Sequence, residues 1–579
     1  MKVPENNYTN SSPCLPWRFE RLINAGVIFF AVVVMFYCGW TLDRGFEITD
    51  EAYYLLLAIH AGTQELYVSA QHWITTWLWQ ITGSLATFRA AGMFLLAGTS
   101  TLLALGTFSV CQRFGVMEDG FQTKGVVVAS SVVSAMLYAS TINFSPCYNL
   151  LASAGAYAAA GLVLLGSQRL SIAQKHVLYV LAGCAVGAEV VCKASAGAST
   201  LVIMVFWLYV FERSYFHKIC GAVAIAAGVV AFAGIALLSN TTIGDATQAI
   251  EQGMQLFTIV QVEAIDARLI RYATQFGQNI MATAVAFALP LISFSIYAKT
   301  RRIIFAKLGL GILVIILLFG GHLLGGWRDG TSFEPPFAIV ALLIIALLVS
   351  TPVWNKNRNL IALFGGLILL PYSVAMGTGN TLFTQVIITL APWGTLIGVL
   401  MVARFQEDIS KMPISLIGLC FIATVSLQIT TSGFRPYHMS SSLTEQDQRF
   451  KTGNLGVVKV DVKTHRFLTD IEAAAKYCQI APGMPFLGLY NTPGVALALQ
   501  AAPVMSPWLN NAAQAEFVLH RTPPEKLNSV IVALNIDRTG ITPQLPSPLK
   551  GFREKFQYCG TAEYPFFDQK IQIWKSFSS

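Results

Sequence analysis

Long apolar runs separated by short polar gaps dominate residues 1–433 of the chain. Most runs have close to the roughly 20 residues that a helix needs to cross the hydrocarbon core of a bilayer. The pattern therefore predicts thirteen membrane-spanning helices. They are expected at residues 22–42, 89–111, 125–142, 150–167, 176–192, 197–212, 218–238, 280–298, 303–325, 335–353, 359–376, 382–403 and 412–431.

Two gaps in this pattern are too long for simple turns. Residues 43–88 contain "DEAYYLLLAIHAG" and "HWITTWLWQITG", in which apolar residues recur at spacings of three and four. We expect two helices along the membrane surface here, with Gly62 and Gly83 as stops. The second long gap, residues 239–279, includes "IEQGMQLFTIVQVEAIDARLIRYATQF", which predicts another surface helix.

The pattern changes after residue 433, where 15 of the 38 Lys and Arg residues are found. Strands are predicted at "GVVKVDVK", "PFLGLY", "SVIVALNI" and "KIQIWKS", and helices at "FLTDIEAAAKYC" and "PGVALALQAA". The fold class predicted is a polytopic α-helical membrane domain, residues 1–433, followed by a soluble α/β domain, residues 434–579.

Composition and charge placement support a membrane protein with a defined orientation. The 579 residues are 54% apolar and only 12% charged, against about 25% charged in an ordinary soluble domain. Lys and Arg collect in alternate gaps, as they do in short cytoplasmic loops. These residues are Lys2, Arg18, Arg21, Arg113, Lys124, Arg169, Lys175, Arg213, Lys218, Lys299, Arg301, Arg302, Lys307, Lys356, Arg358, Arg404 and Lys411. The N-terminus is therefore predicted to be cytoplasmic, the first apolar run to be a signal anchor, and the C-terminal domain to lie outside.

Several function classes lack support in the sequence. The net charge of +8 follows the topology, and no basic patch interleaved with aromatic residues indicates nucleic-acid binding. No Walker loop, dinucleotide fingerprint, nucleophile elbow or zinc spacing is present. His72, His322 and His438 are isolated and are interpreted as single polar or packed residues. Cys478 and Cys559 fall in the outer region, and the sequence allows them either to form a disulfide or to remain two free thiols.

The stretch "DRGFEITDEAYY" places four carboxylates next to the membrane. In a helix, Asp43, Glu47, Asp50 and Glu51 would share one face, where like charges repel. A cation, a metal or a substrate proton would compensate that repulsion, which makes these acids functional candidates. The alternative is that these acids form a solvated cap at the end of the first span, which applies most to Asp43 and Glu47. Of these two weaker candidates, Asp43 is the likelier site residue.

The run from Thr49 to Gly98 resembles the first outer loop and second span of GT-C glycosyltransferases, which take sugars from polyprenyl-phosphate carriers. The acidic pair that opens their loop is matched by Asp50-Glu51 with two tyrosines after it. Gln71-His72-Trp73 stands where their His-Pro-Pro does, and Phe88-Arg89 where their Leu-Arg does. The two prolines are absent, and Thr82-Gly83 replaces a Phe-Gly. The layout as a whole resembles the branch that contains lipid A aminoarabinose transferases and protein O-mannosyltransferases.

This resemblance implies transfer of a sugar from an undecaprenyl-phosphate-like donor to a glycolipid or cell-envelope glycan, such as lipopolysaccharide, on the outer face of a bacterial inner membrane. Asp50 would be the base and Glu51 its partner; whether a divalent metal ion takes part is open, with these two carboxylates as its ligands if it does. The residues expected to bind the donor phosphate are Lys193, Arg89 and Arg271, with Arg268 and Arg328 as alternatives. The residues expected to bind substrate are Asp43, Tyr54, His72, Tyr148 and Asn149.

Other interpretations remain open at this point. Glu189 lies four residues before Lys193, an order in which the two charges neutralise each other on a helix. A flippase for lipid-linked glycans would also be polytopic, but it would need ionisable groups inside several spans. A non-catalytic assembly subunit would bind a glycan or a partner without turnover.

Overall fold

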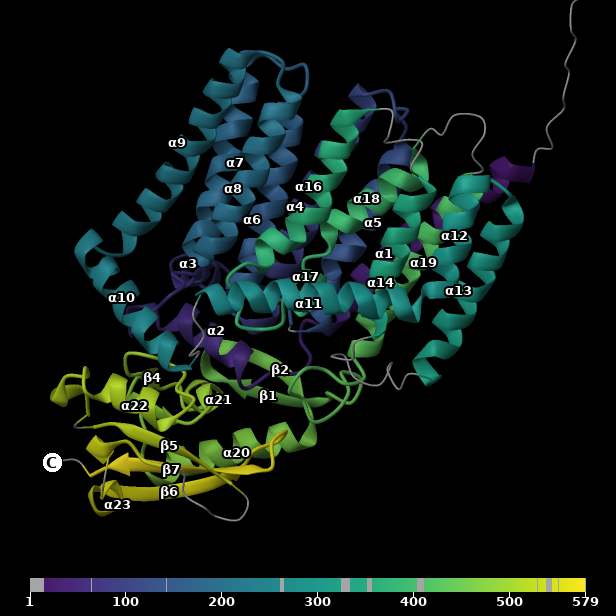
Figure 1. The fold of residues 1–579 in the computed structure, drawn as a ribbon. Helices are drawn as coiled ribbons and strands as arrows, with labels where there is room; N and C mark the ends of the chain where they lie inside the picture. The colour runs from purple at the N-terminus through teal and green to yellow at the C-terminus, as the bar shows by residue number, and fades with distance from the viewer. Residues whose placement is uncertain are drawn as a thin grey trace, which may run out of the picture.

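A computed structural model describes residues 15–63, 65–141, 143–260, 265–323, 334–350, 357–403, 411–527, 529–537, 544–549 and 551–577. A bundle of helices is joined at one end to a smaller region that contains the strands (Figure 1). In the described ranges nine helices are long and apolar enough to cross a membrane, one bent pair passes the same test, and three shorter apolar helices accompany them. Together these account for the thirteen predicted runs, so the predicted fold class is confirmed.

The bundle is built in chain order from helices that begin and end close to the predicted limits. They are α1 (Leu15–Thr41), α4 (Leu85–Arg113), α5 (Phe121–Met136), α6 (Tyr148–Gly166), α7 (Ile172–Cys192), α8 (Ala194–Phe211), α9 (Tyr215–Asn240), α12 (Ala288–Thr300), α13 (Ile303–Leu323), α14 (Glu334–Val349), α16 (Arg358–Ala375), α17 (Leu382–Ile387), α18 (Ala391–Val402) and α19 (Lys411–Ser432).

Two predicted spans are broken, because proline interrupts each of them. The helix expected at 280–298 bends by 81° between α11 (Ile265–Ala286) and α12. Pro290 has no N–H to bond the carbonyl of Ala286, which removes one helical hydrogen bond at the bend. The span expected at 382–403 is divided into α17 and α18, where Pro392 occupies the first turn of the new helix. Both breaks fall inside runs that the sequence pattern predicts as spans.

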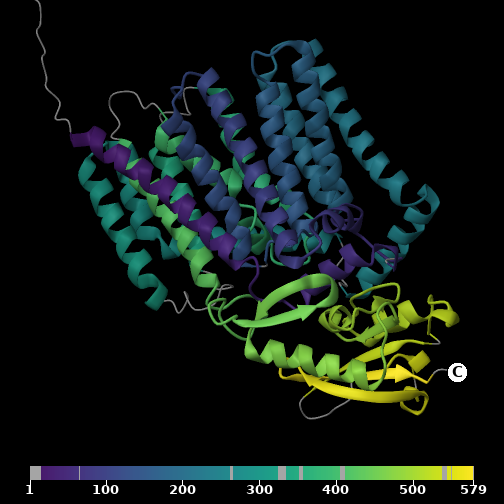
Figure 2. The same ribbon diagram turned by 180° about the vertical axis from the view of Figure 1, so that it is seen from behind.

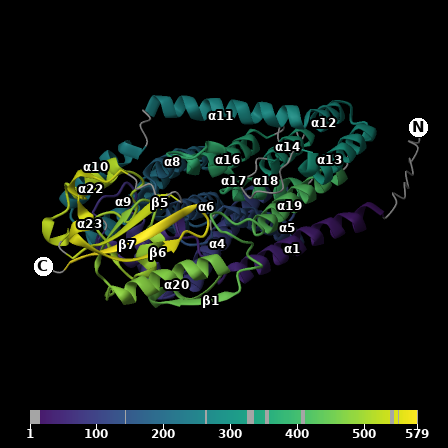
Figure 3. The same cartoon turned by 90° about the horizontal axis from the view of Figure 1, so that it is seen from below.

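Three helices lie between the bundle and the strand-containing region, and α11 runs along the side of the bundle. The three helices in between are α2 (Asp50–Ile59), α3 (His72–Thr82) and α10 (Ile243–Val260). Gly83 ends α3 with a φ of 67°, a left-handed conformation that glycine adopts without steric cost, as its position predicts. Seen from below, α11 runs along one edge of the bundle and α1 along the opposite edge (Figure 3). The surface helices predicted in both long gaps are therefore present.

The C-terminal region contains a five-stranded mixed sheet in the order β4-β3-β5-β7-β6 and a separate antiparallel hairpin, β1-β2. The strands are β1 (Gln448–Thr452), β2 (Gly456–Val460), β3 (Pro485–Leu489), β4 (Ala502–Pro503), β5 (Ile531–Asp537), β6 (Phe556–Glu563) and β7 (Gln569–Ser576). The helices are α20 (Val462–Tyr477), α21 (Pro493–Ala498), α22 (Ala512–Leu519) and α23 (Phe552–Lys555). Cys478 and Cys559 form a disulfide, which settles the alternative that the sequence leaves open.

This region is packed directly onto the first outer loop. A single apolar cluster joins Phe46, Ile48 and Phe88 to Val458 and Phe467 of the C-terminal region. Gly494 donates its N–H to the carbonyl of Ile48, and a Cβ on that glycine would lie 2.7 Å from atoms of Ile48. Figure 2 shows the β1-β2 hairpin directly below the end of α1. The acidic stretch is thus covered by a segment that lies almost 400 residues away in sequence.

Candidate active site

Asp50 is the first residue of α2, and the preceding turn is shaped by Glu47. The Glu47 carboxylate is buried and accepts the backbone N–H of Thr49 at 2.8 Å and that of Glu51 at 2.7 Å. Two N–H groups that the helix cannot satisfy itself are bonded in this way. A negative charge is also favourable at a helix N-terminus. Glu47 therefore fixes the place where α2 begins and where Asp50 points.

The Asp50 carboxylate faces the segment that follows the last described span. Its Oδ2 accepts a hydrogen bond from Tyr437 Oη at 3.0 Å. Burial raises the pKa of Asp50 to about 6, and the charge of Glu47 adds to the rise, while the Tyr437 hydrogen bond and His438 lower it. A carboxylate with a pKa near 6 is still ionised at neutral pH, yet more basic than a solvated one. Asp50 is therefore suited to act as a general base.

Glu51 turns away from Asp50 into the protein and is fully buried against Arg89. Arg89 Nε and Nη2 donate to its two oxygens at 2.7 and 2.6 Å, and Ser145 Oγ donates to it at 2.5 Å. Burial alone would raise the pKa of Glu51, but the charge of Arg89 and these hydrogen bonds outweigh burial and hold the pKa below its usual value. The pair is a structural ion pair at the base of α2.

Arg89 has no donor left for a phosphate. Its remaining N–H groups bond the carbonyls of Leu42 and Arg44 at 3.0 Å and of Gly45 at 2.8 Å. With the two bonds to Glu51, all five N–H groups of the guanidinium are used. The predicted roles of Arg89 as a phosphate ligand and of Glu51 as a catalytic partner are therefore corrected: both hold the acidic loop in shape.

The two remaining acids have different partners. Asp43 pairs with Lys459 of β2 at 2.6 Å and is partly exposed. Glu47 lies near Asp50, and His438 Nδ1 is 3.5 Å from the Glu47 Oε1. Asp43 attaches the C-terminal region to the loop, whereas Glu47 shapes the start of α2. The preference for Asp43 over Glu47 as a site residue stays a prediction, although these contacts place Glu47 nearer to Asp50.

Two of the predicted substrate residues, Tyr54 in α2 and Tyr148 at the start of α6, interact with the charge of Asp50. The rings of Tyr54 and Tyr148 lie 6.0 Å apart, and the backbone N–H of Tyr148 donates to the side chain of Gln71. Asn149 follows Tyr148 and is buried. His72 packs edge-on against Tyr67 at 4.8 Å, and burial lowers its pKa to about 4, so it is neutral at physiological pH.

Lys193 lies between α7 and α8, at the same end of the bundle as α2. It is buried, and its Nζ donates to the carbonyl of Val374 at the end of α16 at 2.8 Å. Among the described residues it forms no ion pair with Glu189, whose Oε1 instead accepts from Thr200 Oγ1 at 3.0 Å. A lysine ammonium has three donors, and within the described ranges one of them is bonded, to Val374. Neutralisation by a direct contact with Glu189 is therefore not the arrangement.

Arg271 approaches the same end of the bundle from α11. Its Nη1 is 3.3 Å from the carbonyl of Asn380, and the neighbouring Tyr272 hydroxyl donates to the carbonyl of Thr378 at 2.6 Å. Ser195, two residues after Lys193, donates to the carbonyl of Met376 at 2.9 Å. Arg271 and Lys193 thus border one loop, residues 376–380. Arg268 lies one turn earlier on α11, and Arg328 lies outside the described residues.

A narrow cleft opens beside Glu47. Its polar lining comes from Glu47, Tyr437, Thr41, Thr141, Asn143 and Ser432. Its apolar lining includes Tyr37, Phe144, Ile429 and Leu443. Apolar walls with a few convergent polar groups are typical of ligand sites.

The predicted metal alternative finds no support in these side chains. In the part of the chain that the structure describes, no three His, Cys, Asp or Glu side chains are grouped so that they could hold a metal ion. Asp50 and Glu51 do not fit as a pair of ligands, because both oxygens of Glu51 are bonded to Arg89.

Comparison with solved structures found, among others, three that are similar to this chain. ArnT from Cupriavidus metallidurans bound to undecaprenyl phosphate is 14% identical, with 94% of this chain and 97% of that chain covered and a TM-score of 0.41. The Archaeoglobus fulgidus oligosaccharyltransferase in complex with Zn and sulfate is 12% identical, with 87% and 67% covered and a TM-score of 0.44. Arabinosyltransferase EmbB from Mycobacterium smegmatis is 14% identical, with 76% and 43% covered and a TM-score of 0.33.

The identities are all below 15% and the TM-scores all below 0.5, so the resemblance to the GT-C superfamily stays a prediction from the sequence. No protein-family model and no curated protein matches the sequence.

The sequence resemblance covers only the first outer loop and the span after it. The residues that the segment after α19 contributes to the site were therefore not predicted. His438, which the sequence suggests is a single polar or packed histidine, is packed against Tyr437, and its Nδ1 lies 3.0 Å from Thr49 Oγ1 and 3.5 Å from Glu47 Oε1. Its neighbour Tyr437 bonds Asp50. The one local signal was a Tyr-His pair directly after a predicted span, next to Pro436.

Proposed function

We propose that this chain is a membrane glycosyltransferase that moves a sugar from a polyprenyl-phosphate donor, such as undecaprenyl phosphate, to a glycolipid or cell-envelope glycan. The observation that carries the proposal is the environment of Asp50. This buried carboxylate has a pKa near 6 and lies at the same end of the bundle as the buried ammonium of Lys193. A base and a cation at one end of a membrane bundle are what sugar transfer from a lipid phosphate requires.

Each group has a defined part in a single displacement. The acceptor hydroxyl oxygen forms a bond to the anomeric carbon of the donor, and Asp50 takes the hydroxyl proton as that bond forms. The bond between the anomeric carbon and the phosphate oxygen breaks, and its electron pair stays on the polyprenyl phosphate. Lys193 stabilises the charge that gathers on this leaving group. One displacement with one base inverts the anomeric centre.

The neighbouring residues supply recognition. Tyr54 and Tyr148 lie near Asp50, and with Asn149, which follows Tyr148, they offer hydroxyl and amide groups to a sugar. Arg271 adjoins the 376–380 loop and offers a second cation to the donor phosphate. The cleft beside Glu47 and Tyr437 has apolar walls that suit the lipid part of a glycolipid acceptor. No step in this scheme depends on a metal ion.

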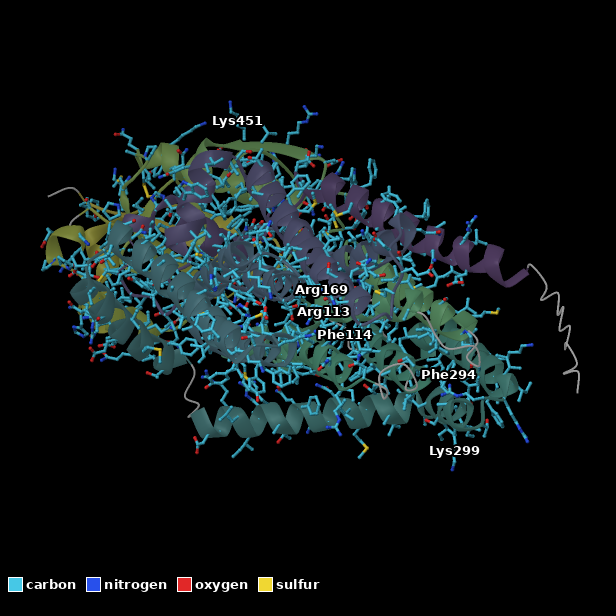
Figure 4. The ribbon with its side chains drawn as sticks, turned by 90° about the horizontal axis from the view of Figure 1, so that it is seen from above. Arg113, Phe114, Arg169, Phe294, Lys299 and Lys451 are labelled. Atoms are coloured by element: carbon cyan, nitrogen blue, oxygen red, sulfur yellow. A yellow bond between two sulfur atoms is a disulfide. The ribbon has the colours of Figure 1, made fainter. Side chains whose placement is uncertain are left out.

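The orientation proposed is a cytoplasmic N-terminus and a C-terminal region on the outer face of a bacterial inner membrane. Arg113, Arg169 and Lys299 are visible from the side opposite the C-terminal region (Figure 4). Because short cytoplasmic loops are rich in Lys and Arg, that side is assigned to the cytoplasm. The site then opens on the outer face.

The direct test is turnover of a labelled polyprenyl-phosphate sugar by the purified full-length protein in the presence of lipid-linked glycan acceptors. We expect release of free polyprenyl phosphate together with a labelled glycan. Movement of the intact donor across a vesicle membrane without either product would contradict the proposal and favour a flippase. Tight binding of the glycan without turnover would also contradict it and favour an assembly subunit.

Replacing Lys193 by methionine is expected to raise the KM for the donor by about 10- to 100-fold, the effect of losing one charge-assisted hydrogen bond. Lys193→Arg should recover part of that loss. The matched control is Lys218→Met, which removes a lysine that contacts Tyr209 in α8 instead. An unchanged donor KM in Lys193→Met would remove Lys193 from the phosphate site.

A further inference from the structure

Two residues from the segment after α19 complete the surroundings of the proposed base. Tyr437 Oη donates to Asp50 Oδ2 at 3.0 Å, and His438 Nδ1 lies 3.0 Å from Thr49 Oγ1 and 3.5 Å from Glu47 Oε1. The two rings are stacked with their centroids 3.7 Å apart. Each of the two residues therefore contacts the start of α2 through a different polar group.

The backbone of this segment is held in an unusual conformation. His438 has a φ of 49°, in the left-handed region that residues with a Cβ rarely adopt. Such strain persists only where the surroundings determine it, and it gathers at functional sites. Here the N–H of Met439 bonds the carbonyl of Pro436 at 3.2 Å, and the His438 ring packs against Phe566 and Phe567 of the C-terminal region at 5.4 and 5.2 Å.

We propose that Tyr437 and His438 are positioning residues that orient the Asp50 carboxylate and keep it in its basic form, so that the C-terminal region completes the active site. Tyr437 does so directly, because a hydrogen bond to the charged form of an acid favours that form. His438 acts through Thr49 and Glu47, which fix the N-terminus of α2. This inference rests on the proposed function, in which Asp50 is the base.

The groups around Asp50 shift its pKa in opposite directions. The proposal can therefore be tested by the direction in which each variant moves that pKa. The ionisable groups that interact with it are Glu47 in its own loop, Tyr53 and Tyr54 in α2, Tyr138 and Cys147 near the start of α6, Tyr148 in α6, Tyr437 and His438 after α19, and Tyr564 in the C-terminal region. Tyr437 and His438 favour the ionised form of Asp50, and Glu47 opposes it. Removing groups from the two sets should therefore move the same titration in opposite directions.

The experiment measures kcat/KM for sugar transfer against pH in purified full-length variants. In the wild type we expect the rate to fall as pH drops through about 6, where Asp50 becomes protonated. Tyr437→Phe should move this acidic limb up by about 0.5 to 1 pH unit, the effect of one hydrogen bond. His438→Asn, which tolerates the left-handed backbone, should move it the same way, and Glu47→Gln should move it down.

Matched controls separate this effect from general damage. Tyr558→Phe removes an exposed tyrosine that bonds Thr561, and His520→Asn breaks an exposed pair with Glu516. Neither should move the limb. Equal loss of rate at every pH in Tyr437→Phe and His438→Asn, with the limb unmoved, would show a merely structural role and overturn the proposal. Absence of transfer in the wild type would instead overturn the proposed function, so the two failures are distinguishable.

Discussion

Replacing Asp50 by asparagine is expected to abolish sugar transfer while the protein still folds. The amide has nearly the same shape as the carboxylate and can still accept the Tyr437 hydrogen bond, but it cannot take a proton from the acceptor. General-base catalysis contributes about 10²- to 10⁴-fold to rates, so kcat should fall by that factor. The measurement is single-turnover transfer with a labelled polyprenyl-phosphate sugar, alongside the thermal unfolding curve.

A matched control is Asp470→Asn, which changes a partly exposed carboxylate on α20 that pairs with Arg466. This variant should transfer sugar at the wild-type rate. Near-normal turnover by Asp50→Asn would show that the proton is taken elsewhere, and Glu47 would then be the nearest acid to test. A loss of folding in Asp50→Asn would be expected to appear as a lower unfolding temperature, which the same preparation measures.

The sequence is informative about Asp50 because the signal is local. An acidic pair next to a predicted span, followed by tyrosines, lies within a dozen residues, and the periodicity of 50–62 places it at a helix start. The same local reasoning could not separate the two members of the pair. Asp50 points to Tyr437 and Glu51 points to Arg89, and these partners lie 387 and 38 residues away.

Long-range pairing also explains what else the sequence does not predict. The charge pattern does not predict that Asp43 pairs with Lys459 or that Lys193 bonds a carbonyl of α16. Helical spacing relates residues three or four positions apart, and these partners are much farther apart in the sequence. The apolar pattern likewise predicts the helices but not their bends, because mean hydropathy does not respond to a single Pro290. Local periodicity thus determined the elements, and contacts between distant segments determined the site.

Breaking the ion pair between Glu51 and Arg89 is expected to be the most destabilising single change in the outer loop. Both side chains are almost completely buried and joined by two hydrogen bonds of 2.6 and 2.7 Å. Removing one partner leaves the other as an uncompensated buried charge, which costs about 3–5 kcal/mol. Glu51→Gln and Arg89→Met should therefore each lower the free energy of unfolding by about that amount, measured by denaturant titration in detergent.

The double variant Glu51→Leu/Arg89→Met distinguishes the interaction energy between Glu51 and Arg89 from the energy of their contacts with other residues. Without either charge the coupling is lost, so its cost should be smaller than the sum of the single costs. Some cost should remain, because the carbonyls of Leu42, Arg44 and Gly45 lose their donors. The exposed pair between Asp119 and Lys124 provides the control, and Asp119→Asn should cost less than about 1 kcal/mol. If Glu51→Gln instead kept wild-type stability and lost all turnover, Glu51 would belong to the chemistry, and the division of labour between the two neighbouring acids would have to be reversed.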